Sequence, residues 1–197
     1  MVIKINGEVL SYSLETEKNI GELLGSIEAA CRKAQETIVT VTADGKELGA
    51  EELDDLFAQP VDADIVIELS TVSGADIRNY MQSLARELLA TAAALEQIPV
   101  YMQTGKDAQV LALLESLSQK LNELYRALLL SDITGLPADI SIEGKLLAEY
   151  QKEITAFLQD IVTGIEEKDI ILVGDLAEYE LAPLVKALIN GVLSFLI

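Results

Sequence analysis

The side chains best suited to chemistry in this sequence are carboxylates in its last third. Asp175, Glu178, Tyr179 and Glu180 follow an apolar run, and Asp175 and Glu178 are three residues apart, which places them on one face of a helix. Paired carboxylates can bind Ca²⁺ or Mg²⁺, or act as an acid and a base. These four residues therefore form a candidate polar cluster. The simpler interpretation is a solvated face in a chain with 33 acidic residues.

Glu149 and Glu153, four residues apart, are open to the same two interpretations. Other catalytic equipment is missing from the sequence. The chain has no His and one Cys, so it can form neither a Cys–His pair nor a zinc site of Cys and His, and it has no Gly-rich phosphate loop. Cys31 lies on an apolar helical stripe and is predicted to be a buried, inert thiol. We predict no catalytic residue, no metal ligand and no cofactor.

The net charge of −19 is spread over the whole chain, with −10 on residues 1–74 and −9 on residues 75–197. Both parts repel phosphate backbones and anionic lipid headgroups, so we expect neither nucleic-acid nor membrane binding. Met1–Ile5 has the pattern of a strand and not of a signal peptide. Together with a single, unpaired cysteine, this pattern leads us to expect a cytoplasmic protein.

The most lipid-like stretch is Leu181–Ile197. It is shorter than the roughly 20 residues that a membrane span requires, and Lys186, Asn190 and Ser194 interrupt it. The stretch is therefore predicted to be a buried helix of a soluble protein.

Periodicity divides the first seventy residues into alternating strand and helix patterns. Ile3 and Ile5 alternate with Val2 and Lys4, and the hairpin signal Asn6-Gly7 follows. A helical stripe, a strand, a turn, a short helix and a last strand come next; the residues that mark them are Ile20, Leu24, Ile27 and Cys31, then Thr37–Ala43, Asp44-Gly45, Ala50–Phe57 and Ile65–Leu69. In the middle strand, alternation predicts Val39 and Val41 facing the core and Ile38, Thr40 and Thr42 facing outward.

This order of elements resembles the ubiquitin-like β-grasp over residues 1–72. The closest local likeness is Ala43–Leu48 followed by Ile65–Leu69. The resemblance implies a docking module. It does not imply conjugation, because Leu69–Gly74 carries a single Gly and continues into further chain, whereas conjugated members end in a free Gly-Gly.

Eight acids between Asp44 and Asp64 surround a small apolar group, with Lys46 as the basic residue among them. The central segment is the candidate partner-docking surface: Leu53, Asp54, Asp55, Leu56 and Phe57. Such a surface suits a basic or amphipathic segment of a partner protein. Alternatively, the acids solvate a turn.

Residues 75–197 are predicted to form an all-α antiparallel helical bundle. The first two helices carry apolar residues at alternating spacings of four and three, apart from one step that Thr91 fills: Ile77, Met81, Leu84, Leu88, Leu95, Ile98 and Met102, then Val110, Leu114, Leu117, Leu121, Leu124 and Leu128. Ser141 is predicted to cap the third helix, and Pro183 to kink or divide the last one. Ile170–Val173 fits a strand or a helix, and the stripe that follows favours a helix.

The helices are apolar beyond one seam, with Leu129 widening the second helix and Val185, Ile189 and Leu196 the last. We expect such faces to be buried in a homodimer. The fold class is therefore α+β, a ubiquitin-like β-grasp followed by a helical bundle. The expected function is a non-enzymatic, chaperone-like interaction or adaptor protein. The alternative is a metal-binding or hydrolytic protein that uses the carboxylates of Asp175–Glu180.

Overall fold

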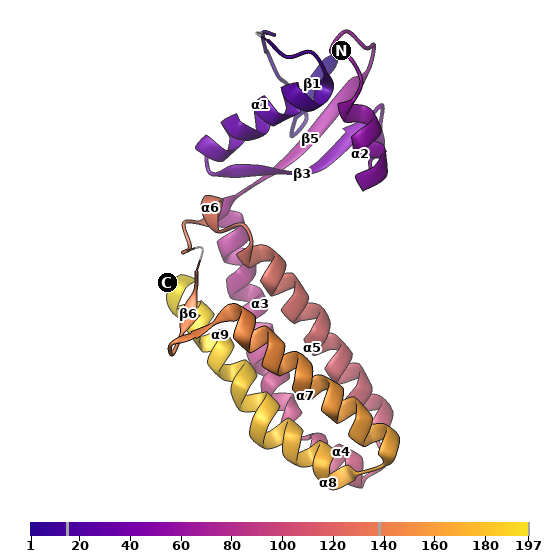
Figure 1. Cartoon of the computed structure of the whole chain (residues 1–197), viewed down its shortest axis with the longest axis vertical. Helices are drawn as coiled ribbons and strands as arrows, with labels where there is room; N and C mark the ends of the chain where they lie inside the picture. Colours follow the sequence, from indigo (N-terminus) through magenta and orange to yellow (C-terminus); the bar gives the residue numbers. More distant parts are fainter. Residues whose placement is uncertain (15, 138, 197) are drawn as a thin grey trace. The chain divides into compact units, whose positions relative to one another are not determined.

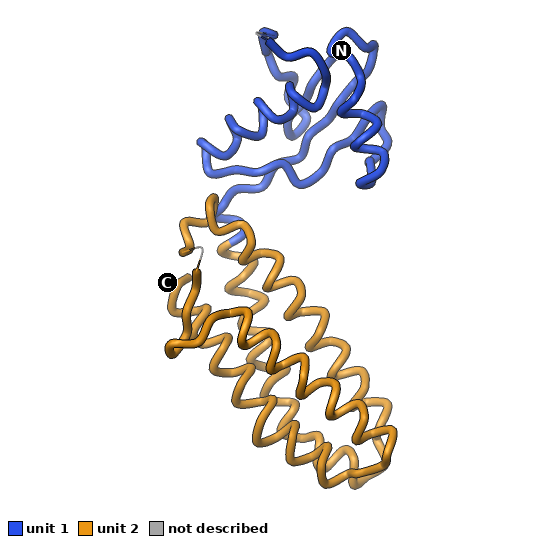
Figure 2. Tube along the Cα trace, viewed as in Figure 1, with its two compact units in different colours: residues 1–77 blue, residues 78–197 orange. Residues whose placement is uncertain are grey.

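The chain is an α+β protein in which a mixed sheet precedes a set of helices, as predicted from the sequence (Figure 1). The computed structural model describes residues 1–14, 16–137 and 139–196. Two compact units divide it: unit 1 is Met1–Ile77 and unit 2 is Arg78–Ile197 (Figure 2). Ile197, the end of the stretch predicted as a buried helix, lies outside the described residues.

Unit 1 contains a five-stranded mixed sheet, counted over the described residues, with strand order β2-β1-β5-β3-β4. Its elements are β1 Val2–Ile5, β2 Glu8–Val9, α1 Ile20–Lys33, β3 Glu36–Ala43, β4 Lys46–Glu47, α2 Ala50–Phe57 and β5 Val66–Ser73. The strands β1 and β5 are parallel, whereas β1 with β2, β3 with β5 and β3 with β4 are antiparallel. The Asn6-Gly7 and Asp44-Gly45 turns have positive φ at both residues, as their sequences predict.

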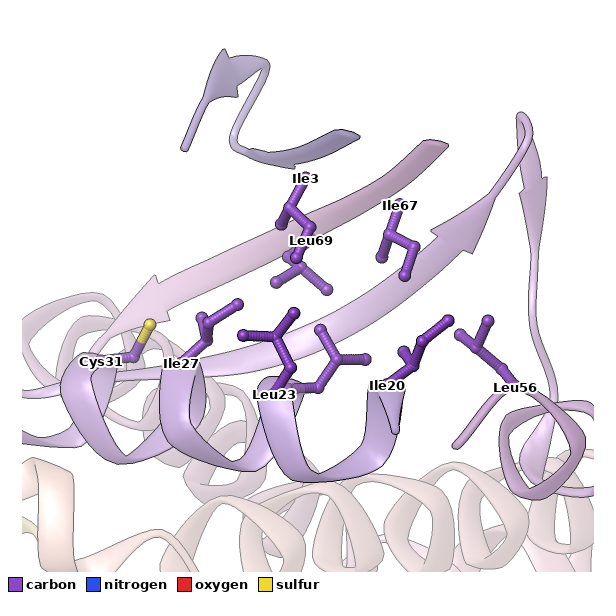
Figure 3. Close-up of a cluster of buried hydrophobic side chains, with 9 residues drawn as sticks. Ile3, Ile20, Leu23, Ile27, Cys31, Leu56, Ile67 and Leu69 are labelled. Atoms are coloured by element: carbon purple, nitrogen blue, oxygen red, sulfur yellow. The ribbon is translucent and has the colours of Figure 1, made fainter. Parts of the chain in front are cut away.

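Helix α1 lies across the sheet and supplies half of the core of unit 1. Asn19 caps it, since the Asn19 Oδ1 accepts a hydrogen bond from the Glu22 backbone N–H at 2.8 Å. The apolar stripe of α1 and the central strands enclose one buried cluster (Figure 3), whose members are Ile3, Ile20, Leu23, Leu24, Ile27, Cys31, Leu56, Ile67 and Leu69. The helical stripe read from the sequence is thus the buried face.

The predicted alternation in β3 is wrong at its centre. The register between β3 and β5 shifts between Ile38 and Thr40, so Val39 is the extra residue of a β-bulge. Val39 is 53% exposed, whereas Ile38 and Val41 pack against the core. A bulge inserts one residue into the strand, and this exchanges the two faces of the strand beyond it.

Unit 2 is a helical bundle in which α3, α5, α7 and α9 lie side by side (Figure 1). Its elements are α3 Gly74–Leu95 (which begins in unit 1), α4 Ile98–Gln103, α5 Asp107–Leu128, α6 Ser131–Thr134, β6 Ser141–Ile142, β7 Lys145–Leu146, α7 Leu147–Glu167, α8 Ile170–Asp175, the π-helix η1 Leu176–Leu181 and α9 Ala182–Leu196. Every residue predicted for the seams of the first two helices is buried.

Unit 2 is not entirely helical, which corrects the prediction for Ser141. This residue does not cap α7 but begins β6, which pairs with β7 in a short antiparallel hairpin. The turn residues Glu143 and Gly144 both have positive φ, which fits a two-residue hairpin turn. At the start of α7, the Glu149 carboxylate accepts a hydrogen bond from the Leu146 N–H at 2.7 Å. Gly144, which adopts positive φ easily, therefore favours a hairpin turn in front of α7.

The C-terminal helix runs without interruption from Ile170 to Leu196 through α8, η1 and α9. Ile170–Val173 is therefore helical, as favoured from the sequence. Pro183 does not divide the helix. A proline ring crowds the carbonyl group four residues earlier, at Tyr179, and the π-helical turns of η1 widen the backbone there.

The side chains that widen the apolar face of α9 are buried within one chain. Val185 and Ile189 are completely buried, and Leu196 is 6% exposed. One copy of unit 2 therefore covers this face, contrary to the expectation that a partner copy is needed for it. Of the side chains that widen the second helix, Leu111 of α5 and Leu129, which follows α5, are exposed.

Candidate functional site

The residues predicted for partner docking do not form one surface. Leu56 is only 2% exposed and belongs to the core of unit 1, beside Ile20 (Figure 3). Asp54 and Asp55 are exposed, Leu53 is half-buried and Phe57 is partly exposed. An eight-residue helix that packs on a sheet must bury one of its apolar positions, and α2 buries Leu56. The predicted surface is therefore reduced to Phe57 and its acidic neighbours.

Phe57 contributes to an apolar groove between α1, β3 and α2, here called the unit 1 groove. Its volume is about 280 Å³, and its lining residues are Gly21, Leu24, Gly25, Glu28, Ile38, Val41 and Phe57. Gly21 allows α1 to approach α2, because a Cβ there would lie 2.9 Å from the Phe57 Cβ. A Cβ at Gly25 would meet nothing within 4 Å. Gly25 is therefore an open position in the groove.

Glu28, the charged residue lining this groove, holds the β-bulge. Its carboxylate accepts hydrogen bonds from the Thr37 hydroxyl at 2.7 Å and from the Ile38 N–H at 2.9 Å, and it pairs with Arg32 at 2.7 Å. Burial raises the pKa of Glu28, but the hydrogen bonds from Ile38, Thr37 and Arg32 outweigh this effect and lower it below its ordinary value. Glu28 is thus committed to structure, and the groove offers an apolar surface.

The candidate polar cluster of Asp175, Glu178, Tyr179 and Glu180 lies on or beside the π-helix η1. Asp175, Tyr179 and Glu180 are exposed, and Glu178 is half-buried. The negative charge of Glu178 and a hydrogen bond to its carboxylate raise the pKa of Tyr179. Among the described residues, no group of three or more His, Cys, Asp or Glu side chains is placed to hold a metal ion. The metal-binding or hydrolytic alternative stays a prediction.

The pair Glu149 and Glu153 is divided between two structural roles. Glu149 caps the start of α7, and Glu153 forms an ion pair with Lys145 of β7. Cys31 is buried, and burial together with the charges of Glu28 and Glu36 raises the pKa of its thiol. The predicted burial of Cys31 is thus confirmed, and its inertness stays a prediction that the raised pKa supports.

A larger pocket lies in unit 2 and was missed by sequence reasoning. It occupies about 460 Å³ between the end of α5, the β6–β7 hairpin and the start of α7. We call it the Tyr125 pocket, and its lining residues are Asn122, Tyr125, Arg126, Leu128, Leu129, Asp139, Ile140, Leu146, Leu147, Ala148 and Gln151. The one available signal was the run Leu128-Leu129-Leu130, in which Leu129 falls off the buried stripe. Leu129 is 81% exposed.

The C-terminal helix also passes the length and apolarity test for a membrane span. The segment Ile170–Leu196 has 27 residues, so the helix is longer than the stretch Leu181–Ile197 that was predicted to be too short for a span. Within its most apolar window, 39% is buried inside the structure. Core helices of soluble proteins pass the same test, so this finding is weak evidence in either direction.

These features define a class: a two-unit α+β protein with apolar grooves on both units and without a metal-binding cluster in the described ranges. The chain belongs to the family defined by the domain of unknown function DUF8042, whose model matches residues 79–191. The model of the TP0873 N-terminal domain matches residues 1–73. An uncharacterized protein of Treponema pallidum (strain Nichols) is 46% identical over 193 residues, covering 98% of this chain and 96% of the relative. No solved structure matches the chain.

Proposed function

We propose that the chain is a non-enzymatic adaptor protein in which unit 1 binds a basic, amphipathic segment of a partner protein. The observation that carries the proposal is the unit 1 groove, an apolar channel of about 280 Å³ whose charged lining residue, Glu28, is already paired. An apolar channel of this kind takes up the apolar face of an amphipathic helix.

We further propose that unit 1 is a β-grasp of the ubiquitin-like kind. The supporting features are the parallel pair of β1 and β5 in the middle of the sheet, the hairpin before α1, and α1 lying across one face. The family resemblance implies docking through the outer surface of such a module. The β-grasp resemblance thus supports a docking role for unit 1, and the unit 1 groove is the proposed place where the partner binds.

The charge of unit 1 selects the partner. Residues 1–74 carry 15 acidic and 5 basic side chains. Arg32 and Lys46 among these bases are paired with Glu28 and Glu52, and because each pair cancels one charge of each sign, the net charge of these residues stays at −10. Such a field attracts a basic segment and repels nucleic acid and anionic lipid, so we propose neither as a partner. A cytoplasmic location is part of the same proposal, supported by the buried, unpaired Cys31.

The test measures binding of the full chain to a fluorescent amphipathic peptide of about 18 residues, built from Leu, Ala and Lys at helical spacing. A twin peptide with Glu in place of Lys is the charge control. We expect saturable binding of the basic peptide that weakens with added salt, and at least about tenfold weaker binding of the acidic twin.

Two variants on α1 locate the binding site. Gly25→Leu fills the groove from a position where a Cβ meets no neighbour, so the variant should fold and lose at least about tenfold in affinity. Ala30→Leu adds a similar side chain at an exposed position of α1 outside the groove lining and should leave affinity unchanged. Equal affinities of the two variants, or equal binding of the two peptides, would refute the proposal.

Self-association through unit 2 is the second part of the proposal. Its support is an exposed apolar group where α4 adjoins α8, with Ile171 being 72% exposed and Val100, Ile170 and Leu172 exposed nearby. Pro99 of α4 packs on Gly174 of α8, where an added Cβ would lie 3.3 Å away. Light scattering at micromolar concentration should give the mass of a dimer, and Ile171→Glu should give that of a monomer. A monomeric wild-type chain would remove this part without affecting the groove.

A further inference from the structure

The hydroxyl group of Tyr125 is the starting point, because it is buried and has no hydrogen-bond partner among the described residues. Burial also raises the pKa of this phenol well above its ordinary value. An orphaned buried hydroxyl costs about 1–3 kcal/mol, and native structures leave few polar groups in this state. The cost disappears if an occupant of the adjoining pocket brings a hydrogen-bond acceptor.

The lining of the Tyr125 pocket indicates what kind of occupant that is. Its apolar part comes from five side chains of α5, β7, α7 and the segment before the hairpin: Leu128, Leu129, Ile140, Leu146 and Leu147. Asn122 and Gln151 add primary amides, each of which can donate and accept as a peptide group does. A volume of about 460 Å³ lies within the range of clefts that hold small ligands, so it has room for a single large side chain.

The charge of the pocket differs from that of the rest of the chain. Its charged lining residues are one cation, Arg126, and one anion, Asp139, whereas the whole chain carries −19. A balanced pair favours an uncharged occupant, since a net charge on the ligand would be repelled by one partner as much as attracted by the other. The Tyr125 pocket therefore favours an uncharged occupant, whereas the unit 1 groove favours a basic segment.

We propose that the Tyr125 pocket is a second peptide-binding site that takes one large, uncharged apolar side chain of a partner segment, with the adjoining peptide carbonyl accepting a hydrogen bond from the Tyr125 hydroxyl. Leu129 and Leu146 are exposed at the pocket in the free protein and become covered by the bound segment. A bound segment whose carbonyl reaches the Tyr125 hydroxyl supplies the hydrogen-bond partner that this group lacks among the described residues.

The experiment titrates the full chain, labelled on its leucine methyl groups, with N-acetyl-leucine methylamide and follows the Leu129 methyl signals by NMR. The lysine and glutamate analogues of the same probe are the comparators. We expect saturable shifts at millimolar concentrations for the leucine probe, as for other fragments of this size, and at least about tenfold weaker binding of both charged analogues.

Two variants in the Tyr125 pocket test the site, and two variants outside it serve as controls. Tyr125→Phe removes only an unpaired hydroxyl, so it should fold and bind the leucine probe about fivefold to tenfold more weakly. Ala148→Leu fills the pocket from an exposed lining position and should abolish the shifts, while Ala156→Leu, eight residues further along α7 and outside the lining, should preserve them. Gly25→Leu in unit 1 should have no effect, so failure of this site and failure of the unit 1 groove are distinguishable.

Any one of three results would overturn the proposal. The first is the absence of saturable shifts at Leu129 with the wild-type chain. The second is equal binding of the leucine, lysine and glutamate probes. The third is binding that Ala148→Leu and Ala156→Leu leave equally intact.

Discussion

The β6–β7 hairpin is held against α9 by a contact that a single methyl group should break. Gly191 of α9 faces Ile142 of β6, and a Cβ at position 191 would lie 2.3 Å from the Ile142 Cγ2 and 2.6 Å from its Cγ1 and Cδ1. Ile142 is itself buried. The substitution Gly191→Ala therefore forces the hairpin and the helix apart or drives Ile142 out of its rotamer.

The magnitude follows from two opposing effects. Overpacking a buried contact costs about 1–3 kcal/mol. Replacing Gly by Ala inside a helix gains about 1 kcal/mol, because Ala loses less backbone entropy on folding. We therefore expect Gly191→Ala to destabilise unit 2 by about 1 kcal/mol, although the same change normally stabilises a helix.

A double-mutant cycle isolates the contact. Ile142→Ala removes all three crowding atoms and by itself costs about 2–5 kcal/mol. In that background, Gly191→Ala should become stabilising by about 0.5–1 kcal/mol, so the sign of its effect reverses. The assay is urea unfolding of the full chain, with the helical transition followed by far-ultraviolet circular dichroism. If Gly191→Ala has the same effect in both backgrounds, the hairpin is not packed on α9 through this pair.

Three further predictions follow from single positions. Gly25→Ala should stabilise unit 1 by about 0.5–1 kcal/mol in urea unfolding, because its Cβ enters open space; a loss of stability would mean that the groove is closed. Tyr125→Phe should raise the melting temperature of unit 2 by roughly 3–5 °C, because it removes an unpaired buried hydroxyl; a lower melting temperature would mean that the hydroxyl has a partner. Glu28→Ala should destabilise unit 1 by about 2 kcal/mol near neutral pH, since the Ile38 N–H loses its acceptor; an unchanged urea midpoint would contradict this role. Since folding lowers the pKa of Glu28, its contribution is complete above the ordinary value of 4.5 and disappears as pH falls through the folded-state pKa, so this variant should lose less stability on acidification than the wild type.

Local patterns predicted the helices well because burial and periodicity act on the same residues. The four-and-three spacing in α3 and α5 identified seam residues that are buried throughout. Periodicity could not locate the bulge at Val39, because the position of an extra residue depends on which residue of β5 lies opposite. The partly buried Glu28 carboxylate accepts a hydrogen bond from the Ile38 N–H beside this bulge, and that contact joins residues ten apart in the chain.

The predicted docking residues differ from the grooves in the structure for the same reason: local patterns do not show which residues are in contact with distant parts of the chain. A helical wheel of α2 shows that Leu53, Leu56 and Phe57 share a face, but it cannot show which of them the sheet covers. The packing of α2 against α1 determines which side chain is covered. Leu56 is buried in the core, and Phe57 lies at the edge of the groove beside Gly21. An apolar residue predicted for binding is more often required for folding, because both roles select the same side chains.

In each of the two grooves, one position holds a residue that is less favourable for folding than another residue would be. Gly25 lies inside a helix where Ala would be more stable, and it keeps open the channel that a larger side chain would fill. Tyr125 buries a hydroxyl without a partner where Phe would satisfy the packing. Each costs folding free energy, and stabilising replacements at such positions commonly reduce function. Suppose that Gly25→Leu and Tyr125→Phe both stabilise the chain, and that each abolishes or weakens binding only at its own groove. The folding free energy lost at Gly25 and at Tyr125 is then the cost of two separate binding sites on one adaptor.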